Sequence, residues 1–241
     1  MIICRIWLFL AGVIFGLLIA IALPARASDR NFPRPALAYV LVHEGGFSNN
    51  PNDRGGVTLE GVTQKVYDAA RADKGLPRRA LAPEMRGQPE WIKERNDIYR
   101  WRFWLPCAGD KLPAGLDYAV FDWCVNAGVK QASKHLRRAL NLPEEDWLIT
   151  PDVLSQVRRT HVPSLLRDLY AIRVKFYRAL CTARAAQCGF LPGWLARAAT
   201  GEALALKLNN PRLGGLAAFD LKPALGPGKA FAEDETEEEA R

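Results

Sequence analysis

Histidine is scarce in this chain, with three scattered copies among 241 residues. No Cys-x-x-Cys pair and no cysteine–histidine group has the spacing of a zinc site. The sequence also has no internal repeat, which excludes an array of short structural repeats. We therefore expect a single globular body whose function needs no metal ion and no other cofactor.

Charge is absent from Ile6 to Leu23, directly after Arg5. Pro24 follows, and then Ala25-Arg26-Ala27 has the small-x-small pattern of a signal-peptidase site. The apolar run exceeds most signal-peptide cores and approaches the shortest run that spans a bilayer, so an uncleaved inner-membrane anchor is the alternative to cleavage. In both cases we expect residues 1–27 to lie outside the fold and to deliver the body to the periplasm.

The remainder of the chain is basic. The net charge is +7, although residues 233–239 alone hold six acidic side chains. A basic body suits nucleic acid, an anionic membrane or an anionic polymer such as the bacterial wall. Export removes most of the case for nucleic acid and leaves an anionic membrane surface or the bacterial wall as the expected partner.

Four cysteines follow the leader, Cys107, Cys124, Cys181 and Cys188. An even number suits disulfides in an oxidising compartment, and three pairings are open. On one continuous helix Cys181 and Cys188 would lie about 10 Å apart, beyond disulfide reach. These two cysteines can therefore pair only if the chain turns between them.

Apolar spacing predicts a mainly α fold. A first helix follows Pro33 and Pro35 and stops at Gly45-Gly46, and a turn-rich stretch with a short strand after it predicts a small β-hairpin. Thr63 suits the N-cap of a second helix that ends near Arg71. Further helices are expected over 90–104, 113–128, 129–140, 152–159, 164–183 and 193–207, and residues 208–241 are expected to form a disordered acidic tail.

Glu44 is the strongest catalytic candidate. It ends the first helix, where it faces the negative end of the helix dipole, and burial removes part of its hydration. Both effects raise the pKa of a carboxyl group. A carboxyl that keeps its proton near neutral pH is what the leaving oxygen of a glycosidic bond requires.

Asp53 and Thr58 lie in the hairpin that follows. Asp53 is in a polar turn that favours the ionised form, so it forms an acid/base pair with Glu44, and Thr58 is placed to orient a water. The simpler interpretations are a turn-forming aspartate and an ordinary strand threonine. His43 is expected to be structural, because one titratable partner already suffices.

This stretch resembles the signature of the glycoside hydrolase family 108 muramidases. The matching motifs are Glu44-Gly45-Gly46-Phe47, then Asp53-Arg54-Gly55-Gly56-Val57-Thr58, then Gly61-Val62-Thr63. Three family-like segments follow in order. The first contains Ile98-Tyr99 and Phe103-Trp104, the second contains Leu112-Pro113, Phe121-Asp122 and Val125-Asn126-Ala127-Gly128, and the third contains Gly193-Trp194-Leu195 and Arg197. One departure is Asp146-Trp147-Leu148-Ile149-Thr150-Pro151, which keeps only the outline of a D-G-x-x-G-P turn.

The resemblance implies a lysozyme-like fold and cleavage of the bond between N-acetylmuramic acid and N-acetylglucosamine. It implies a catalytic segment over 34–127 and a peptidoglycan-binding segment over 128–207, which we expect to share one core in a monomer. Phe47 is a candidate sugar contact. Tyr118, Asp122 and Asn126 lie opposite the apolar stripe of their helix, where they line either a sugar cleft or a solvated face.

Two rival functions stay open. A lytic transglycosylase needs one acid and no water-positioning partner, and a catalytically silent wall-binding accessory of a secretion apparatus needs neither. Core packing is the expected role of the aromatics Tyr99, Trp101, Phe103 and Trp104. Solvation is the expected state of the basic face made by Lys130, Lys134, Arg137 and Arg138.

Overall fold

The computed structural model describes residues 32, 35–49, 56–144 and 147–210. The leader, Asp53 and the acidic tail from residue 211 lie outside the described residues. In the described part of the chain, no helix combines the length and the apolar character that crossing a bilayer requires.

The first half of the chain builds a small sheet and the helices around it. It contains α1 (Ala36–His43), β1 (Phe47–Ser48), β2 (Thr58–Leu59), β3 (Val62–Thr63), α2 (Gln64–Asp73) and α3 (Pro89–Tyr99). The strands pair antiparallel in the order β1-β2-β3, with Phe47 opposite Leu59 and Thr58 opposite Thr63. The predicted hairpin is therefore two strands of a three-stranded sheet.

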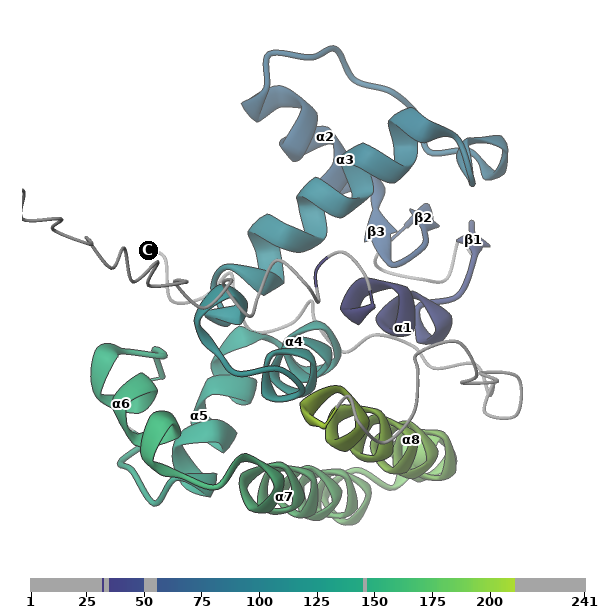
Figure 1. Ribbon diagram of the computed structural model, residues 1–241. Helices are drawn as coiled ribbons and strands as arrows, with labels where there is room; N and C mark the ends of the chain where they lie inside the picture. The colour runs from purple at the N-terminus through teal and green to yellow at the C-terminus, as the bar shows by residue number, and fades with distance from the viewer. Residues whose placement is uncertain (1–31, 33–34, 50–55, 145–146, 211–241) are drawn as a thin grey trace, which may run out of the picture.

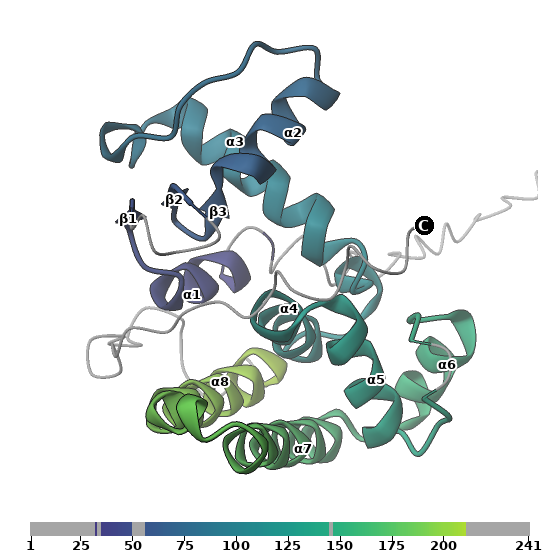
Figure 2. The same ribbon diagram turned by 180° about the vertical axis from the view of Figure 1, so that it is seen from behind.

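The second half of the fold is helical. It contains α4 (Leu116–Ala127), α5 (Val129–Ala139), α6 (Pro151–Arg159), α7 (Val162–Ala183) and α8 (Leu191–Asn209). Figure 1 shows α4 at the centre, with α1, α5 and α8 around it, and Figure 2 shows the same arrangement from behind. The mainly α, lysozyme-like fold with a small sheet beside α1 is confirmed.

Local signals set most helix ends. The Thr63 hydroxyl accepts a hydrogen bond from the Val66 N–H at 3.3 Å, so the predicted N-cap of α2 is confirmed. Proline stands in the first turn of α3, α6, α7 and α8, where its missing N–H costs nothing. The third helix was predicted to run to Trp104, but α3 ends at Tyr99 and a π-helical turn covers Arg100–Trp104.

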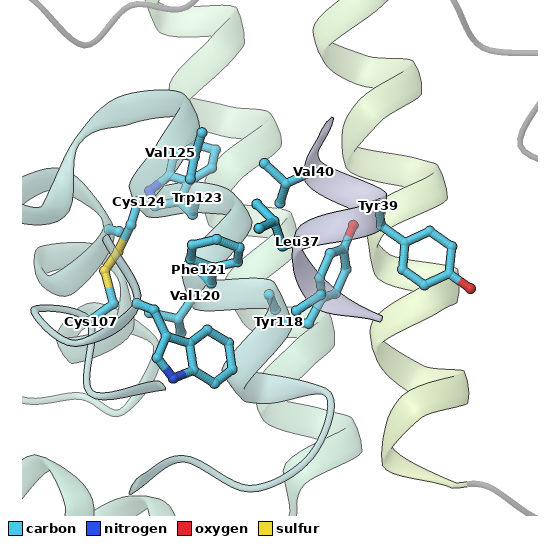
Figure 3. Close-up of a cluster of buried hydrophobic side chains, with 14 of the residues drawn as sticks. Leu37, Tyr39, Val40, Cys107, Tyr118, Val120, Phe121, Trp123, Cys124 and Val125 are labelled. Atoms are coloured by element: carbon cyan, nitrogen blue, oxygen red, sulfur yellow. A yellow bond between two sulfur atoms is a disulfide. The ribbon is translucent and has the colours of Figure 1, made fainter. Parts of the chain in front are cut away.

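One core joins the whole described fold. Its buried side chains run from Phe32 to Leu208 and include Trp91, Trp104, Phe121 and Trp123. Figure 3 shows part of this core, with α4 side chains packed beside Leu37 and Val40 of α1. This core crosses residue 127 without a break. The division into a catalytic and a binding segment at that residue stays a prediction.

The disulfides are Cys107–Cys124 and Cys181–Cys188. The first lies inside the core, where both cysteines are fully buried (Figure 3). The second closes the turn where α7 ends at Ala183 and 3₁₀ residues Ala185–Phe190 lead into α8. The turn brings the Cα atoms of Cys181 and Cys188 to within 4.6 Å of each other. The chain thus turns between the two cysteines, as their pairing requires.

Two expectations about exposure are wrong. Arg137 was assigned to a solvated basic face, but it is buried and donates hydrogen bonds to the Leu148 carbonyl and the Thr150 hydroxyl. Among the aromatics assigned to the core, Tyr99 and Trp104 are buried, whereas Trp101 is 68% exposed. Trp101 stands on the π-helical turn, which re-aims side chains relative to the helix before it.

Candidate active site

Glu44 lies at the C-cap of α1, one residue before the exposed Gly45. The helix before it is apolar and packs on α4, so the end of the helix carries the carboxyl group into the interior. The Glu44 side chain is 4% exposed. The residues that follow, Phe47 to Asn49, are exposed, so the chain reaches the surface directly after the acid.

Arg197 of α8 holds this carboxyl. Its Nη1 and Nη2 atoms both donate to Glu44 Oε1 at 3.1 Å. The two residues are 153 positions apart in the sequence and meet because α1 and α8 both pack on α4. The Arg197 side chain is itself 9% exposed, so this contact is shielded from water.

Asp122 of α4 holds the other side of the same guanidinium. Arg197 donates to Asp122 Oδ1 from Nη2 at 2.8 Å and from Nε at 3.1 Å. Arg173 of α7 donates to Asp122 Oδ2 at 2.5 Å, and the Asp122 side chain has no exposed surface. Asp122 therefore bridges two arginines, each from a different helix of the second half of the fold.

Further contacts fix Arg173. Its Nε donates to the Tyr177 hydroxyl at 3.0 Å, and its guanidinium carbon lies 4.4 Å from the centre of the Trp123 ring. The Tyr177 hydroxyl donates to Asn126 Oδ1 at 2.5 Å. Charge and hydrogen bonding thus continue from Glu44 through α8, α4 and α7 without leaving the protein interior.

The sheet forms the opposite wall of the site. Gly61 lies between β2 and β3 with a φ of +80°, a left-handed conformation that favours glycine. A Cβ at this position would lie 3.1 Å from Glu44 Cβ and 3.3 Å from Glu44 Oε2. The Tyr99 hydroxyl donates to the Glu60 carbonyl at 2.9 Å and closes the site from α3.

The surroundings set the pKa of Glu44. Burial raises this pKa above its usual range, Arg197 opposes the increase through its charge and hydrogen bonds, and the charge of Asp122 adds to it. The predicted direction is therefore confirmed. Burial is the largest cause of the raised pKa, whereas the sequence analysis named burial and the helix dipole together.

Asp122 is shifted in the opposite direction. Although burial alone raises its pKa, the charges of Arg197 and Arg173 outweigh burial and hold this pKa well below its usual range. The pKa values of the two carboxyl groups are therefore shifted in opposite directions, that of Asp122 downward and that of Glu44 upward. This is the separation of pKa values that acid catalysis needs, on a different aspartate from the one expected.

The hairpin candidates have the following places. Thr58 lies in β2, where its hydroxyl donates to the Gly56 carbonyl at 3.2 Å. Phe47 lies in β1, three residues after Glu44, and is 39% exposed. Asp53 lies outside the described residues. Catalysis by Asp53 and Thr58 and sugar binding by Phe47 stay predictions.

The exposure expected for Tyr118, Asp122 and Asn126 is wrong. These side chains are 2%, 0% and 3% exposed, because α4 is covered on every side by neighbouring helices. Tyr118 packs edge-on against Tyr39 of α1, and Asn126 accepts from Tyr177. Asp122 acts on the site through Arg197 in this structure, and no face of α4 is left to line an open cleft.

Arg197 and Arg173 were missed as site residues. Arg197 belongs to a segment that resembles the family, but no role followed from that resemblance. A signal for Arg173 is its position on the apolar face of α7, in line with Leu166, Leu169, Tyr170 and Tyr177. A charged residue on a buried face needs a partner of opposite charge, and that requirement points to a buried carboxylate.

The described residues hold no group of histidine, cysteine or acidic side chains that could bind a metal ion. The chemistry that the site supports is proton transfer. A carboxyl group that is buried, fixed by a guanidinium and inclined to keep its proton can act as a general acid. It cannot swing away, because both arginine nitrogens hold the same oxygen.

Comparisons with known proteins identify the class of enzyme. Residues 37–128, which contain Glu44 and Asp122, match the model of the family described as glycosyl hydrolase 108. The structure is similar to that of Brucella abortus SagA, with a TM-score of 0.56 and 27% sequence identity over 73% of this chain and 94% of that chain. No curated protein matches the chain. The chain is therefore a glycoside hydrolase with a lysozyme-like fold, and its match to glycosyl hydrolase 108 extends over residues 37–128.

Proposed function

We propose that this protein is a peptidoglycan hydrolase that cleaves the β-1,4 bond between N-acetylmuramic acid and N-acetylglucosamine, with Glu44 as the general acid. The observation that carries the proposal is the state of the Glu44 carboxyl. It is 4% exposed, held by Arg197 and shifted toward the protonated form. The family match over residues 37–128 supports a glycosidic bond as the target.

The proposed reaction follows from these contacts. Glu44 donates its proton to the glycosidic oxygen as the bond to the sugar carbon breaks, and an oxocarbenium-like sugar develops. The carboxylate that remains on Glu44 is stabilised by Arg197, which already lies within hydrogen-bond distance. Asp53 is proposed to stabilise the cationic sugar or to activate water, Thr58 to orient that water, and Phe47 to contact a sugar ring.

A lytic transglycosylase is the second candidate. It also needs an acid, but it replaces water by an internal sugar hydroxyl as the nucleophile. One observation favours this candidate: among the described residues, Asp122 is the carboxylate that shares Arg197 with Glu44, and its bonds to two arginines leave it unable to activate water. The products separate the two reactions, since hydrolysis leaves a reducing end and transglycosylation leaves an anhydro sugar.

The test is Glu44→Gln in the full chain. Glutamine keeps the shape of the side chain but cannot donate a proton to the leaving oxygen, so lysis of purified peptidoglycan should fall by about 10²–10⁴-fold. Mass spectrometry of the parent's products should show reducing ends. Anhydro ends would replace the muramidase by the transglycosylase, and lysis within twofold of the parent would remove Glu44 as the acid.

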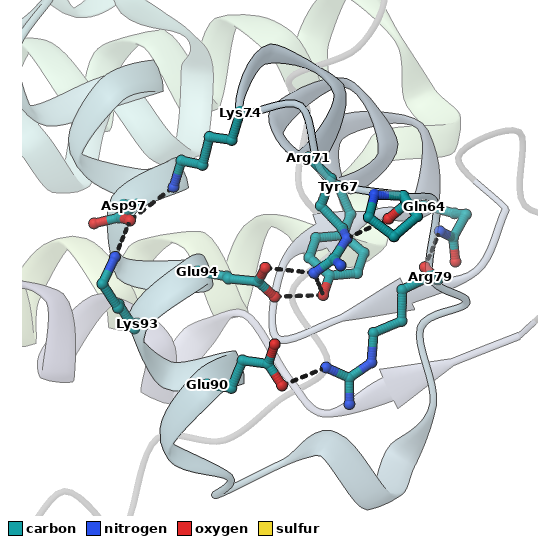
Figure 4. Close-up of polar contacts among 10 residues, drawn as sticks. Gln64, Tyr67, Arg71, Lys74, Arg79, Glu90, Lys93, Glu94 and Asp97 are labelled. Atoms are coloured by element: carbon teal, nitrogen blue, oxygen red, sulfur yellow. Dashed lines mark hydrogen bonds and ion pairs between the residues drawn. The ribbon is translucent and has the colours of Figure 1, made fainter.

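Glu94→Gln is a matched control for this test. Glu94 is also a buried glutamate bound by an arginine, since Arg71 Nη1 donates to its Oε1 at 2.5 Å between α2 and α3 (Figure 4). The Tyr67 hydroxyl donates to its other oxygen. This variant removes a buried carboxyl group that is held by an arginine, as Glu44→Gln does, and it should keep its lytic activity.

We also propose that the protein acts in the periplasm as a monomer, exported through residues 1–27, with a secretion-system component as a further partner. The disulfides Cys107–Cys124 and Cys181–Cys188 support export, because such bonds persist in oxidising compartments. N-terminal sequencing of periplasmic protein should return Ser28-Asp29-Arg30. Recovery of Met1 from the membrane fraction would establish the anchor instead.

A further inference from the structure

Arg197 lies between two carboxyl groups that belong to different helices. Its Nη2 atom donates both to Glu44 Oε1 at 3.1 Å and to Asp122 Oδ1 at 2.8 Å. Nη1 serves Glu44 alone, and Nε serves Asp122 alone. The planar guanidinium is therefore fixed in orientation by Asp122 and presents its remaining edge to Glu44.

This arrangement resolves a conflict within the site. An arginine beside a carboxyl group normally removes its proton at neutral pH, because the opposite charge stabilises the carboxylate. A general acid must keep that proton. Asp122 lies on the far side of Arg197 and carries a negative charge that opposes the effect of the guanidinium on the Glu44 carboxyl.

We propose that Arg197 and Asp122 are positioning residues for the acid: Arg197 fixes the Glu44 carboxyl, and Asp122 offsets the charge of Arg197 so that the fixed carboxyl keeps its proton. This inference rests on the proposed role of Glu44. It assigns a task in the reaction to the second half of the fold, because Arg197 belongs to α8. It also gives a reason for a fully buried aspartate on α4.

The other groups that face Glu44 do not supply the same offset. On α1, burial and then the charge of Arg197 lower the pKa of His43 to about 4, so this ring is neutral at working pH. On α3, burial raises the pKa of Tyr99 well above its usual value, so this phenol is neutral too. On the sheet side, the Glu60 carboxylate is bound by Arg95, Arg86 and the Trp91 N–H, whereas Asp122 binds the same guanidinium as Glu44.

Arg173 of α7 acts on Asp122 and not on Glu44. It donates to Asp122 Oδ2 at 2.5 Å, while Tyr177 and the Trp123 ring hold it from behind. Asp122 therefore has a permanent partner that is independent of Glu44. Because of that partner, Asp122 stays ionised whether or not Glu44 carries its proton.

The test compares pH profiles of lysis for variants of the full chain. The alkaline limb of the profile marks the pH at which the acid loses its proton. Asp122→Asn removes the offsetting charge, so the Glu44 carboxyl should lose its proton more readily and the limb should move to lower pH by about 1–3 units. Arg197→Gln removes the cation, so the limb should move to higher pH.

Arg197→Lys separates charge from position. Lysine keeps the positive charge but has no planar fork, so the limb should stay near its parental pH while the maximal rate falls. Arg71→Gln is the matched control, because Arg71 pairs with buried Glu94 at a similar exposure of 9%. It should change neither the limb nor the rate.

A direct titration makes the result independent of turnover. The carboxyl signal that is present in the parent and absent from Glu44→Gln, followed by infrared or carbon NMR spectroscopy, reports protonation of Glu44 itself. The pH midpoint of this titration should be lower in Asp122→Asn and higher in Arg197→Gln than in the parent. If Asp122→Asn does not fold, the test rests on the two Arg197 variants: the titration should move to higher pH in Arg197→Gln and stay at the parental pH in Arg197→Lys.

The inference would be overturned if the folded variants Asp122→Asn and Arg197→Gln titrate at the parental pH, or if both move in the same direction. Failure of the proposed function has a different result. In that case Glu44→Gln retains lysis, whereas the titration of the Glu44 carboxyl still responds to Asp122 and Arg197.

Discussion

Gly61 is the residue at which the sheet comes closest to the acid. Its φ of +80° is one that residues with side chains rarely adopt, and the space on the side of a Cβ is already filled. The Tyr99 hydroxyl would lie 2.2 Å from a Cβ at this position, far inside van der Waals contact. Tyr99 cannot easily withdraw, because its ring is buried and its hydroxyl is bonded to the Glu60 carbonyl.

Gly61→Ala should therefore damage both stability and activity. Gly75 is a matched control, since its φ is +66° but no atom lies within 4 Å of its Cβ direction. Gly75→Ala has only the backbone cost, about 1–2 kcal/mol, and should keep its lytic rate. Gly61→Ala should lose at least about 1–3 kcal/mol more in denaturant unfolding, because Tyr99 and Glu44 must both move. Equal losses for the two variants would show that the contact with Tyr99 has no energetic weight.

At the scale of elements, the helix ends were predictable because their signals are local. Thr63, the prolines and Gly128 act on residues within one turn of themselves, so the bounds of α2, α4 and α5 lie within a few residues of the expected ones. The position of Glu44 at the end of α1 followed from the same kind of signal. The raised pKa of Glu44 was predictable for the same reason, since an apolar helix leads into it.

The partners of these elements were not predictable, because no local pattern encodes them. α4 shows an apolar stripe in sequence, and polar residues off such a stripe are ordinarily exposed. In the structure α1, α5, α7 and α8 all contact α4, so Tyr118, Asp122 and Asn126 are buried as well. Arg197 reaches Glu44 across 153 residues, and only the packing of α8 on α4 brings them together.

At the scale of the whole molecule, the family match covers less than the folded body. It ends at residue 128, whereas the core continues to Leu208. The packing of α4 depends on the later helices, as Trp123 shows. The centre of its ring lies 5.3 Å from that of His135 on α5, and 5.6 Å and 5.4 Å from those of Phe176 and Tyr177 on α7. Removal of the later helices would expose this side of α4 and leave Asp122 without either arginine.

Residues 34–127 alone should therefore neither fold cooperatively nor lyse peptidoglycan. Each large side chain that loses its cover forfeits about 1.5–3 kcal/mol, so a few of them equal a typical total stability of about 5–15 kcal/mol. The buried Asp122 carboxylate is also left without its two arginine partners. The measurements are thermal unfolding by near-ultraviolet circular dichroism and lysis of purified peptidoglycan, with residues 34–210 as the control. Cooperative unfolding and parental lysis by the short fragment would show that the later helices serve wall binding alone, and that Glu44 needs no arginine to act.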